Sequence, residues 1–383
     1  MRKCIIIYSL LLALTAMSCR KLPVHQEIQE SIEFVSPMVQ TKSMLITDKT
    51  QMKSGENELA YGVFAARYLP DGQGNITSHD ADFMTNLKVY SDLTGEEWHY
   101  DGDRYFWSPG AAYKFFAVYP YYNASGDDTY DLGISYSINT SEHALQVTGK
   151  HVVQSGTDEE LIICTGTNAS GENYLCPDIL YGVSKYPEPY QVGEVRGPVN
   201  FRMEHAFSAL SFRFRNASEY AISSIYTYTD VDNPSGSSKI NMQVTGFDNV
   251  ADHVFLSDDG AVWSEPYYMP DHSFLVPQVN TMISSGAYYP GENDFWYTAL
   301  IIPQDFADYP VSPSFTFFVD MGTAGEKKYK INFKDYPVHA EADKAYKFLP
   351  GKRYVYNFNV TASKVLCDVT IVPWIEDDPI QLN

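Results

Sequence analysis

Residues able to carry out chemistry are scattered along this chain, and few stand at the spacing that a reactive site needs. The nine histidines form no cluster, and the sequence has no H-E-x-x-H, no G-x-S-x-G, no P-loop and no Cys/His zinc pattern. DVDNP at residues 230–234 resembles the start of a calcium loop, but proline occupies a ligand position and the later glycine and glutamate do not follow at the required spacing. We therefore predict no catalytic residue, no metal site and no cofactor.

The one residue with a clear chemical role is Cys19, at the end of an N-terminal leader. Two basic residues precede an apolar run to Leu14, shorter than the ~20 residues of a membrane-spanning helix, so residues 1–18 are predicted to be a secretory signal peptide. The ending LTAMSC resembles a lipobox, in which cleavage makes the cysteine the first residue and acyl chains such as palmitate are attached. The other interpretation is an ordinary signal peptide cleaved near Ala16 or Ser18.

The net charge argues against two classes of partner. Removing the leader takes away two basic and no acidic residues, so the formal net charge moves from −21 to −23. A surface this acidic repels phosphate backbones, which argues against nucleic acid, and it disfavours docking on anionic lipids through basic patches. The balance suits a soluble ectodomain held at the membrane by its lipid.

The elements that would position any site are strands. Aromatic residues make up 15% of the chain, and short alternating apolar runs recur between clusters of Gly, Pro, Asn and Asp. The best helical candidate beyond the leader is His339–Leu349, so we predict an all-β fold of antiparallel sandwiches and disfavour a parallel α/β enzyme. The last strand, at residues 365–372, places four apolar side chains on one face: Val365, Cys367, Val369 and Ile371.

The composition also suggests how the chain is divided. Residues 19–30 are a polar tether, and SIEFVSPMVQ at residues 31–40 is a first strand, which a lysine-bearing polar stretch follows. A loop with two glycines and a proline at residues 190–200 is the best domain seam. This gives an N-terminal β-sandwich at residues 31–195 and a C-terminal β-sandwich at residues 196–383.

Cysteine and aromatic residues leave alternatives open. Cys164 and Cys176 are the local candidates for a disulfide after export, but the sequence does not establish their separation. Four aromatic residues are candidates for stacking on a sugar: Trp98, Tyr100, Tyr121 and Tyr122. Sandwich cores and cross-strand pairs also use aromatic residues heavily, and we favour that structural role. His205, at the start of an apolar strand, is likewise interpreted as structural.

Five segments follow one another along the chain: FWSPGAAYKFFAVYPYY (106–122), VNFRMEHAFSALSFRFRN (199–216), YTALIIPQ (297–304), FLPGKRYVYNFNV (348–360) and VTIVPW (369–374). Together, in this order, they resemble the fimbrillin family of Bacteroidetes, in its Mfa-like branch. The lipobox and the leading IEF strand fit the same family. The resemblance implies two transthyretin-like β-sandwich domains, export as an outer-membrane lipoprotein, and assembly into adhesive fimbriae by donor-strand exchange. In that mechanism a protease cut after Arg or Lys frees the first strand, and a strand from a neighbour's C-terminal region fills the groove.

Carried onto this sequence, residues 31–40 are the expelled strand, and the donor is the strand at residues 365–372. The cut is expected after one of three lysines: Lys42, Lys49 or Lys53. The segment has no arginine before Arg67, which lies inside a predicted strand, and this lack departs from subunits matured by an arginine-specific protease.

The expected partners are other fimbrial subunits, and shaft, anchor and tip positions all stay open. The competing hypothesis is a non-polymerising surface lipoprotein that binds a glycan or a host protein through its loops. An enzyme such as a glycan hydrolase is the least supported class.

Overall fold

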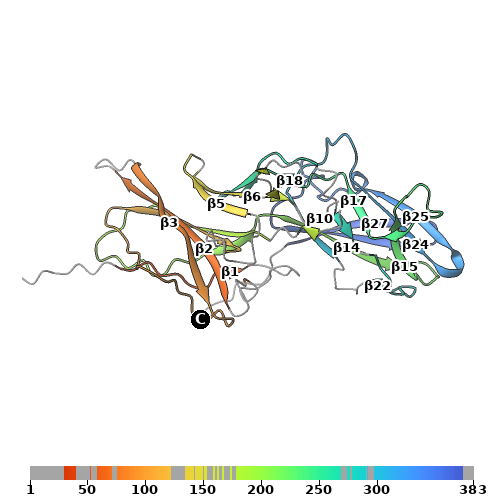
Figure 1. Ribbon diagram of the computed structural model, residues 1–383, viewed down its shortest axis with the longest axis horizontal. Helices are drawn as coiled ribbons and strands as arrows, with labels where there is room; N and C mark the ends of the chain where they lie inside the picture. Colours follow the sequence, from red (N-terminus) through yellow and green to blue (C-terminus); the bar gives the residue numbers. More distant parts are fainter. Residues whose placement is uncertain are drawn as a thin grey trace, which may run out of the picture.

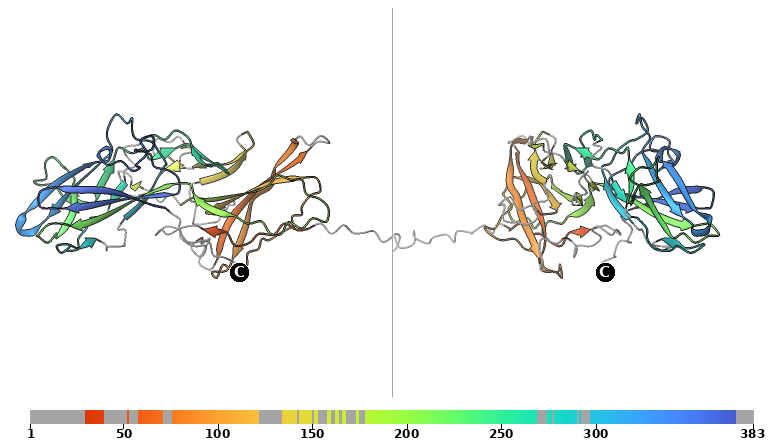
Figure 2. Two further views of the ribbon diagram at one scale, coloured as in Figure 1. Left: turned by 180° about the vertical axis from the view of Figure 1, so that it is seen from behind. Right: turned by 45° about the vertical axis from the view of Figure 1, so that its right-hand side comes forward.

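The structure is a computed structural model, and every structural statement below concerns the residues that it describes. These are residues 30–39, 52, 58–70, 76–121, 134–141, 143–149, 151–152, 158–159, 162–163, 166–167, 173–174, 178–268, 274–276, 278–289, 291 and 297–373. Two lobes lie end to end along the long axis of the molecule, with β1 to β3 in one and β14, β24 and β27 in the other (Figure 1). Two further views show the same arrangement (Figure 2).

The N-terminal lobe consists of two facing sheets. The larger sheet has the order β1-β13-β12-β4-β2-β3, and the smaller has the order β20-β19-β6-β5. The strands of the larger sheet are β1 (Met38–Val39), β2 (Leu59–Pro70), β3 (Ile76–Ser91), β4 (Ala112–Tyr119), β12 (Leu180–Tyr186) and β13 (Arg202–His205). Those of the smaller sheet are β5 (Ile134–Asn139), β6 (Ala144–Gly149), β19 (His253–Ser257) and β20 (Gly260–Trp263). Strand β4 is buried on both faces, because one face lies against the smaller sheet and the other against the core that holds residues 30–39.

The C-terminal lobe is a second pair of sheets. One has the order β22-β14-β26-β27, with β23 also pairing β14: β14 (Ser208–Asn216), β22 (Tyr288–Tyr289), β23 (Tyr297–Ile301), β26 (Lys352–Val360) and β27 (Val365–Pro373). The other has the order β16-β15-β24-β17-β21, with β25 pairing β24: β15 (Ser224–Tyr228), β16 (Lys239–Ile240), β17 (Met242–Thr245), β21 (Phe274–Val276), β24 (Ser314–Asp320) and β25 (Glu326–Asn332). Alternating aromatic side chains from both sheets fill the space between them.

Short pairs and turns complete the fold. The two-residue strands are β7 (His151–Val152), β8 (Asp158–Glu159), β9 (Ile162–Ile163), β10 (Gly166–Thr167), β11 (Asn173–Tyr174) and β18 (Val250–Ala251). The helical turns are η2 (Gly322–Ala324) and η3 (Phe333–Asp335). Within the described ranges no helix has the length and apolar character needed to cross a bilayer.

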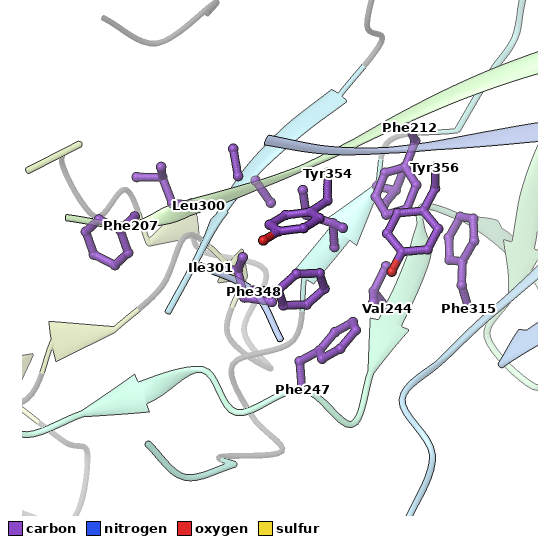
Figure 3. Packing of buried hydrophobic residues seen from close by; sticks show 14 of the residues in the cluster. Phe207, Phe212, Val244, Phe247, Leu300, Ile301, Phe315, Phe348, Tyr354 and Tyr356 are labelled. Carbon is purple, nitrogen blue, oxygen red and sulfur yellow. The ribbon is translucent and has the colours of Figure 1, made fainter. Parts of the chain in front are cut away.

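Ring packing dominates the C-terminal core (Figure 3). Phe212 of β14 stacks on Phe315 of β24 with ring centroids 5.2 Å apart, and Phe333 meets the edge of Tyr356 at 4.8 Å. All four side chains are buried. The sheets are therefore joined by edge-to-face and offset contacts, which add to the stabilisation from apolar burial.

The prediction of an all-β fold of antiparallel sandwiches is confirmed. The helical expectation for His339–Leu349 is wrong, because the stretch forms turns and then pairs with residues 304–306. The Phe348 amide donates to the Gln304 carbonyl at 2.9 Å, and the Phe306 amide donates to the Tyr346 carbonyl at 3.0 Å. Main-chain hydrogen bonds to residues 304–306 and the burial of Phe348 thus outweigh the helix propensity of the stretch.

Strands from both sides of the predicted seam at residues 195/196 share sheets in the N-terminal lobe. The β19–β20 hairpin pairs with β6, and β13 pairs with β12. Asp258, in the hairpin turn, forms ion pairs with Lys114 of β4, at 2.7 Å, and with Lys185 of β12. These hydrogen bonds lower the pKa of the Asp258 carboxyl, the bond from Lys114 most. The division into two domains at that seam stays a prediction.

Candidate functional site

The first described segment, residues 30–39, fills a slot between two stretches of the N-terminal lobe. On one side the Ile32 amide donates a hydrogen bond to the Tyr105 carbonyl at 2.8 Å, and the Trp107 amide donates to the Glu30 carbonyl at 3.1 Å. These bonds form an antiparallel bridge, so the beginning of the segment is paired along that edge.

The opposite edge of the segment runs parallel to the stretch that leads into β13. The Val35 amide donates to the Val199 carbonyl at 3.3 Å, and the Val199 amide donates to the Glu33 carbonyl at 2.7 Å. Further along, the Met38 amide donates to the Phe201 carbonyl at 2.9 Å, where β1 begins. Removal of the segment would therefore leave main-chain groups without partners on both walls of the slot.

Two side chains of the segment plug the core beneath it. Ile32 is fully buried and Phe34 is 4% exposed, whereas Glu33 between them faces solvent, as the alternation of a strand requires. The Phe34 ring stacks on Phe201 with centroids 6.2 Å apart and meets the edge of Phe115 at 6.3 Å. Each plug contributes about 1.5–3 kcal/mol of transfer free energy, so apolar burial and the main-chain hydrogen bonds hold the segment together.

Polar contacts hold the beginning of the segment more firmly than its end. Both carboxylate oxygens of Glu30 accept main-chain hydrogen bonds, from Arg196 at 2.8 Å and from Gly197 at 3.1 Å. The Tyr100 hydroxyl donates to a carbonyl of the segment at 2.9 Å. Met38, at the other end, is 51% exposed. The polar contacts of the segment therefore become fewer toward the lysine-bearing stretch.

An arginine surrounded by aromatic rings fixes the wall that receives the Glu30 carboxylate. The Arg196 guanidinium lies 5.1 Å from the ring centroid of Trp107 and 5.4 Å from that of Tyr190. Its Nε donates to Glu194 at 3.0 Å. The pKa of Glu194 is lowered, first by the Gln191 main-chain amide and then by this bond. The wall is thus built from contacts in which the segment takes no part.

The C-terminal strand β27 is also paired, within its own chain. All nine of its residues lie opposite residues of β26 in one antiparallel ladder. Its four alternating apolar side chains, Val365, Cys367, Val369 and Ile371, pack against the C-terminal core but are only half-buried. Strand β27 is the last of its sheet, so its other edge has no strand partner among the described residues.

Several predicted site residues lie outside the described residues. They are the lipidation residue Cys19, the cleavage candidates Lys42, Lys49 and Lys53, the two cysteines Cys164 and Cys176, and Tyr122. Cys367 lies within the described part of the chain as a free, half-buried thiol. Burial raises the pKa of that thiol, which keeps it protonated and poorly reactive.

Trp98 and Tyr100 help to build the slot. The Trp98 ring centroid lies 5.2 Å from that of Tyr61, and its indole N–H donates to the Gly95 carbonyl at 2.9 Å. The Tyr100 ring meets the edge of Phe34 at 5.7 Å. Both rings therefore pack against residues of the core, which is the structural role favoured from the sequence.

His205 lies buried where the chain passes from one lobe to the other. Its Nδ1 is 2.9 Å from a carboxylate oxygen of Asp178, and both side chains are at most 3% exposed.

The stretch at residues 230–234 that resembles a calcium loop forms a turn. The Asp230 carboxylate accepts hydrogen bonds from the main-chain amides of Asp232 and Asn233, as in an ordinary turn. Within the described ranges no group of three or more His, Cys, Asp or Glu side chains is placed to hold a metal ion.

The slot walls are the part of the site that sequence reasoning missed. The sequence assigns Glu30 to the tether, whereas the structure makes it the first anchor of the strand. Residues 105–107 and 199–201 carry no motif that marks them as partners of residues 30–39. A glycine–proline turn before residue 199 was the only local signal that a new edge begins there.

One family model matches most of this chain, and several solved structures resemble it. A family model described as fimbrillin-like matches residues 56–374. A fimbrial protein from Bacteroides vulgatus has the same fold, with 12% identity, a TM-score of 0.50, and coverage of 89% of this chain and 99% of its own. A fimbrial assembly protein from Parabacteroides distasonis is 13% identical over 90% of this chain and 100% of its own, with a TM-score of 0.36. Among curated proteins none matches the chain.

Proposed function

The chain belongs to the fimbrillin-like family, and from this we propose that it is a structural subunit of cell-surface fimbriae or a component associated with them. Membership of the family supports a fimbrial or adhesion role at the cell surface and interaction with other fimbrial subunits. It also supports a structural, non-enzymatic role. We further propose that Cys19 carries the lipid that anchors the chain in the outer membrane, and that subunits join by donor-strand exchange.

The observation that carries the proposal is the slot around residues 30–39. The segment is held by two apolar plugs and by a small number of main-chain bonds on two walls, and it leads into the stretch that holds Lys42, Lys49 and Lys53. A cut there would make the segment a separate peptide that can leave. The slot it vacates offers unpaired N–H and C=O groups and two apolar pockets, which is what an added strand needs.

The donor in this proposal is β27 of a neighbouring subunit. Its alternating apolar side chains are half-buried in its own sheet and gain burial if they enter the slot. Leaving β26 breaks a nine-residue ladder, so donation requires that the new ladder and plugs replace these bonds. Identical subunits joined head to tail in this way form an open filament.

Limited trypsin treatment of residues 19–383 tests the exchange. We expect a cut after Lys42, Lys49 or Lys53, release of the first strand, and ladders of dimers and longer oligomers on gels. The matched control replaces the three lysines by glutamine, which should leave the chain intact and monomeric. Protein that is cut at these positions and stays monomeric would contradict the exchange mechanism.

A removable cross-link tests β27 as the donor. Val355 and Thr370 lie directly opposite each other on β26 and β27, so cysteines at both positions fall within disulfide range. The variant Val355→Cys/Thr370→Cys, with Cys367→Ala, should form no ladder when oxidised and should form one again after a reductant is added. A ladder that persists in the oxidised protein, or after deletion of residues 365–383, would exclude β27.

Labelled antibody and electron microscopy of the producing cells test the broader function. We expect the label along filaments, and for Cys19→Ala we expect the protein in the medium instead of on the cells. Label spread over the cell surface without filaments would favour the non-polymerising lipoprotein.

A further inference from the structure

A hollow of about 260 Å³ lies on the outer face of the C-terminal sheet, away from the slot and the apolar core. It spans β22, β14, β26 and β27, which are neighbours in one sheet of the C-terminal lobe. Six side chains contribute its polar lining: Arg213, Arg215, Tyr288, Asn357, Asn359 and Asp368. The strand register places them in two adjacent rows across the sheet, so that they converge on one place.

The two arginines of the hollow form a pair. Arg213 and Arg215 alternate with Phe214, which is fully buried, so both guanidinium groups face outward. Each lies 5.3 Å from the ring centroid of Tyr288, and Arg213 Nε also donates to Asn357 Oδ1 at 2.8 Å. The ring and the amide hold the guanidinium groups in place, which lowers the entropy lost when they bind an anion.

A carboxylate and an amide stand next to the arginines. Asp368 accepts hydrogen bonds from Asn357 Nδ2 at 2.9 Å and from Asn359 Nδ2 at 3.4 Å. Asp368 faces solvent on β27, so its oxygens can accept further bonds. Hydroxyl groups are the natural donors to such an acceptor. The hollow therefore combines donors for an anion with acceptors for neutral hydroxyls.

From this arrangement we propose that the hollow binds a sugar residue that bears one carboxylate. The arginine pair binds the carboxylate through bidentate hydrogen bonds, and Asp368 and Asn359 bind neighbouring hydroxyls. Phosphate or a strongly acidic peptide is disfavoured, because Asp368 repels additional negative charge. A volume of about 260 Å³ lies just below that of sites for drug-sized ligands, which suits one sugar ring. The site adds a ligand to the proposed fimbrial role. It requires β27 to stay paired with β26, as in the uncut chain, because donation of β27 would remove Asp368 from the hollow.

Calorimetric titration of uncut residues 19–383 tests this site. The ligands are glucuronate and galacturonate, their neutral counterparts glucose and galactose, acetate, and inorganic phosphate. We expect at least one uronate to bind about tenfold more tightly than its neutral counterpart and more tightly than acetate or phosphate. Equal binding of the neutral sugars, stronger binding of phosphate, or no binding of either uronate would overturn the proposal.

Four variants locate the binding. Arg215→Ala should weaken uronate binding about tenfold or more, and Arg215→Lys, which keeps the charge and the fold, should also weaken it because the planar fork is lost. Arg202→Ala removes an exposed arginine of β13 and should change nothing. Asp368→Asn should reduce the preference for the uronate over acetate. Uronate binding that Arg215→Lys and Arg215→Ala leave unchanged would place the site elsewhere and overturn the assignment.

Discussion

The first described segment and the last described strand of this protein are held in different ways. Residues 30–39 make few main-chain bonds, divided between two walls, and depend on Ile32 and Phe34, which are almost completely buried. Strand β27 makes a continuous nine-residue ladder, while its apolar side chains stay half-buried. The segment is held by deeply buried plugs together with a few main-chain bonds, and β27 is held mainly by its backbone ladder.

This difference bears on the proposed exchange, in which the first segment is replaced and β27 is donated. A plug is interchangeable, because any strand with apolar side chains at alternate positions can fill the same pockets and pair with the same walls. A half-buried strand on an open edge has apolar surface still to bury and can gain from a deeper slot. The four predictions below test this contrast, from the largest expected effect to the smallest.

Phe34→Ala should have the largest effect, because it removes the larger plug. We expect a loss of about 3–5 kcal/mol in the unfolding free energy of the N-terminal lobe, measured by urea denaturation, and faster release of the segment after trypsin treatment. Glu33→Ala, the exposed neighbour, should stay within about 0.5 kcal/mol of the unmodified protein. Equal effects of the two changes would show that the plug does not hold the segment.

Asp258→Asn should destabilise the same lobe without touching residues 30–39. Loss of the ion pairs with Lys114 and Lys185 is expected to lower the unfolding free energy by about 1–2 kcal/mol at pH 7, allowing for the exposure of Lys185. Since the pKa of Asp258 is lowered in the folded chain, its stabilisation is complete above the unfolded pKa of about 4 and is lost as pH falls through the folded pKa.

The difference between Asp258→Asn and the unmodified protein should therefore shrink when urea denaturation is repeated below pH 4. Release of the first strand after trypsin should be unchanged if the strand leaves by local opening. Release that accelerates as much as in Phe34→Ala would mean that the whole lobe must open first.

Glu30→Gln should weaken the first anchor of the segment. A neutral amide accepts hydrogen bonds from the main-chain N–H groups of Arg196 and Gly197 less strongly than a carboxylate does. We therefore expect the unfolding free energy of the N-terminal lobe to fall by about 1 kcal/mol. Relative to the unmodified protein, amide hydrogen exchange should accelerate more in residues 30–34 than in residues 35–39. Unchanged exchange would remove Glu30 from the holding contacts.

Val369→Ala in β27 should have the smallest effect. We expect the unfolding free energy of the C-terminal lobe to fall by about 1 kcal/mol or less, because the side chain is only half-buried. Leu366→Ala, on the outer face of the same strand and 50% exposed, is the matched control and should change stability less. If donation occurs, Val369→Ala should clearly reduce the amount of trypsin-induced oligomer on gels, while the unfolding free energy of the monomer changes little. A loss as large as that of Phe34→Ala would show that β27 is also held by its side chains.

Strand content was predictable from the sequence because alternation is a local property. Arg67, for example, lies inside β2, where the pattern LAYGVFAARY indicates a strand. The terminal alternation from Val365 to Ile371 is likewise present as β27. The helix expected at His339–Leu349 does not form, because helix propensity is a weak preference. The packing of buried Phe348 and half-buried Tyr346 against Phe306, with the main-chain bonds beside them, outweighs it.

The sequence by itself determined that this chain is built of strands, which face of the terminal strand is apolar, and the family to which its motifs point. Only the tertiary structure decided what each strand pairs with. Residues 30–39 lie between residues 105–107 and 199–201, and β14 runs parallel to β26, although long stretches of sequence separate these partners. Alternation fixes the faces of a strand but leaves its edges unassigned, because main-chain groups are the same in every residue except proline. The partners are therefore chosen by which plugs fit which core, and that choice exists only in the folded chain.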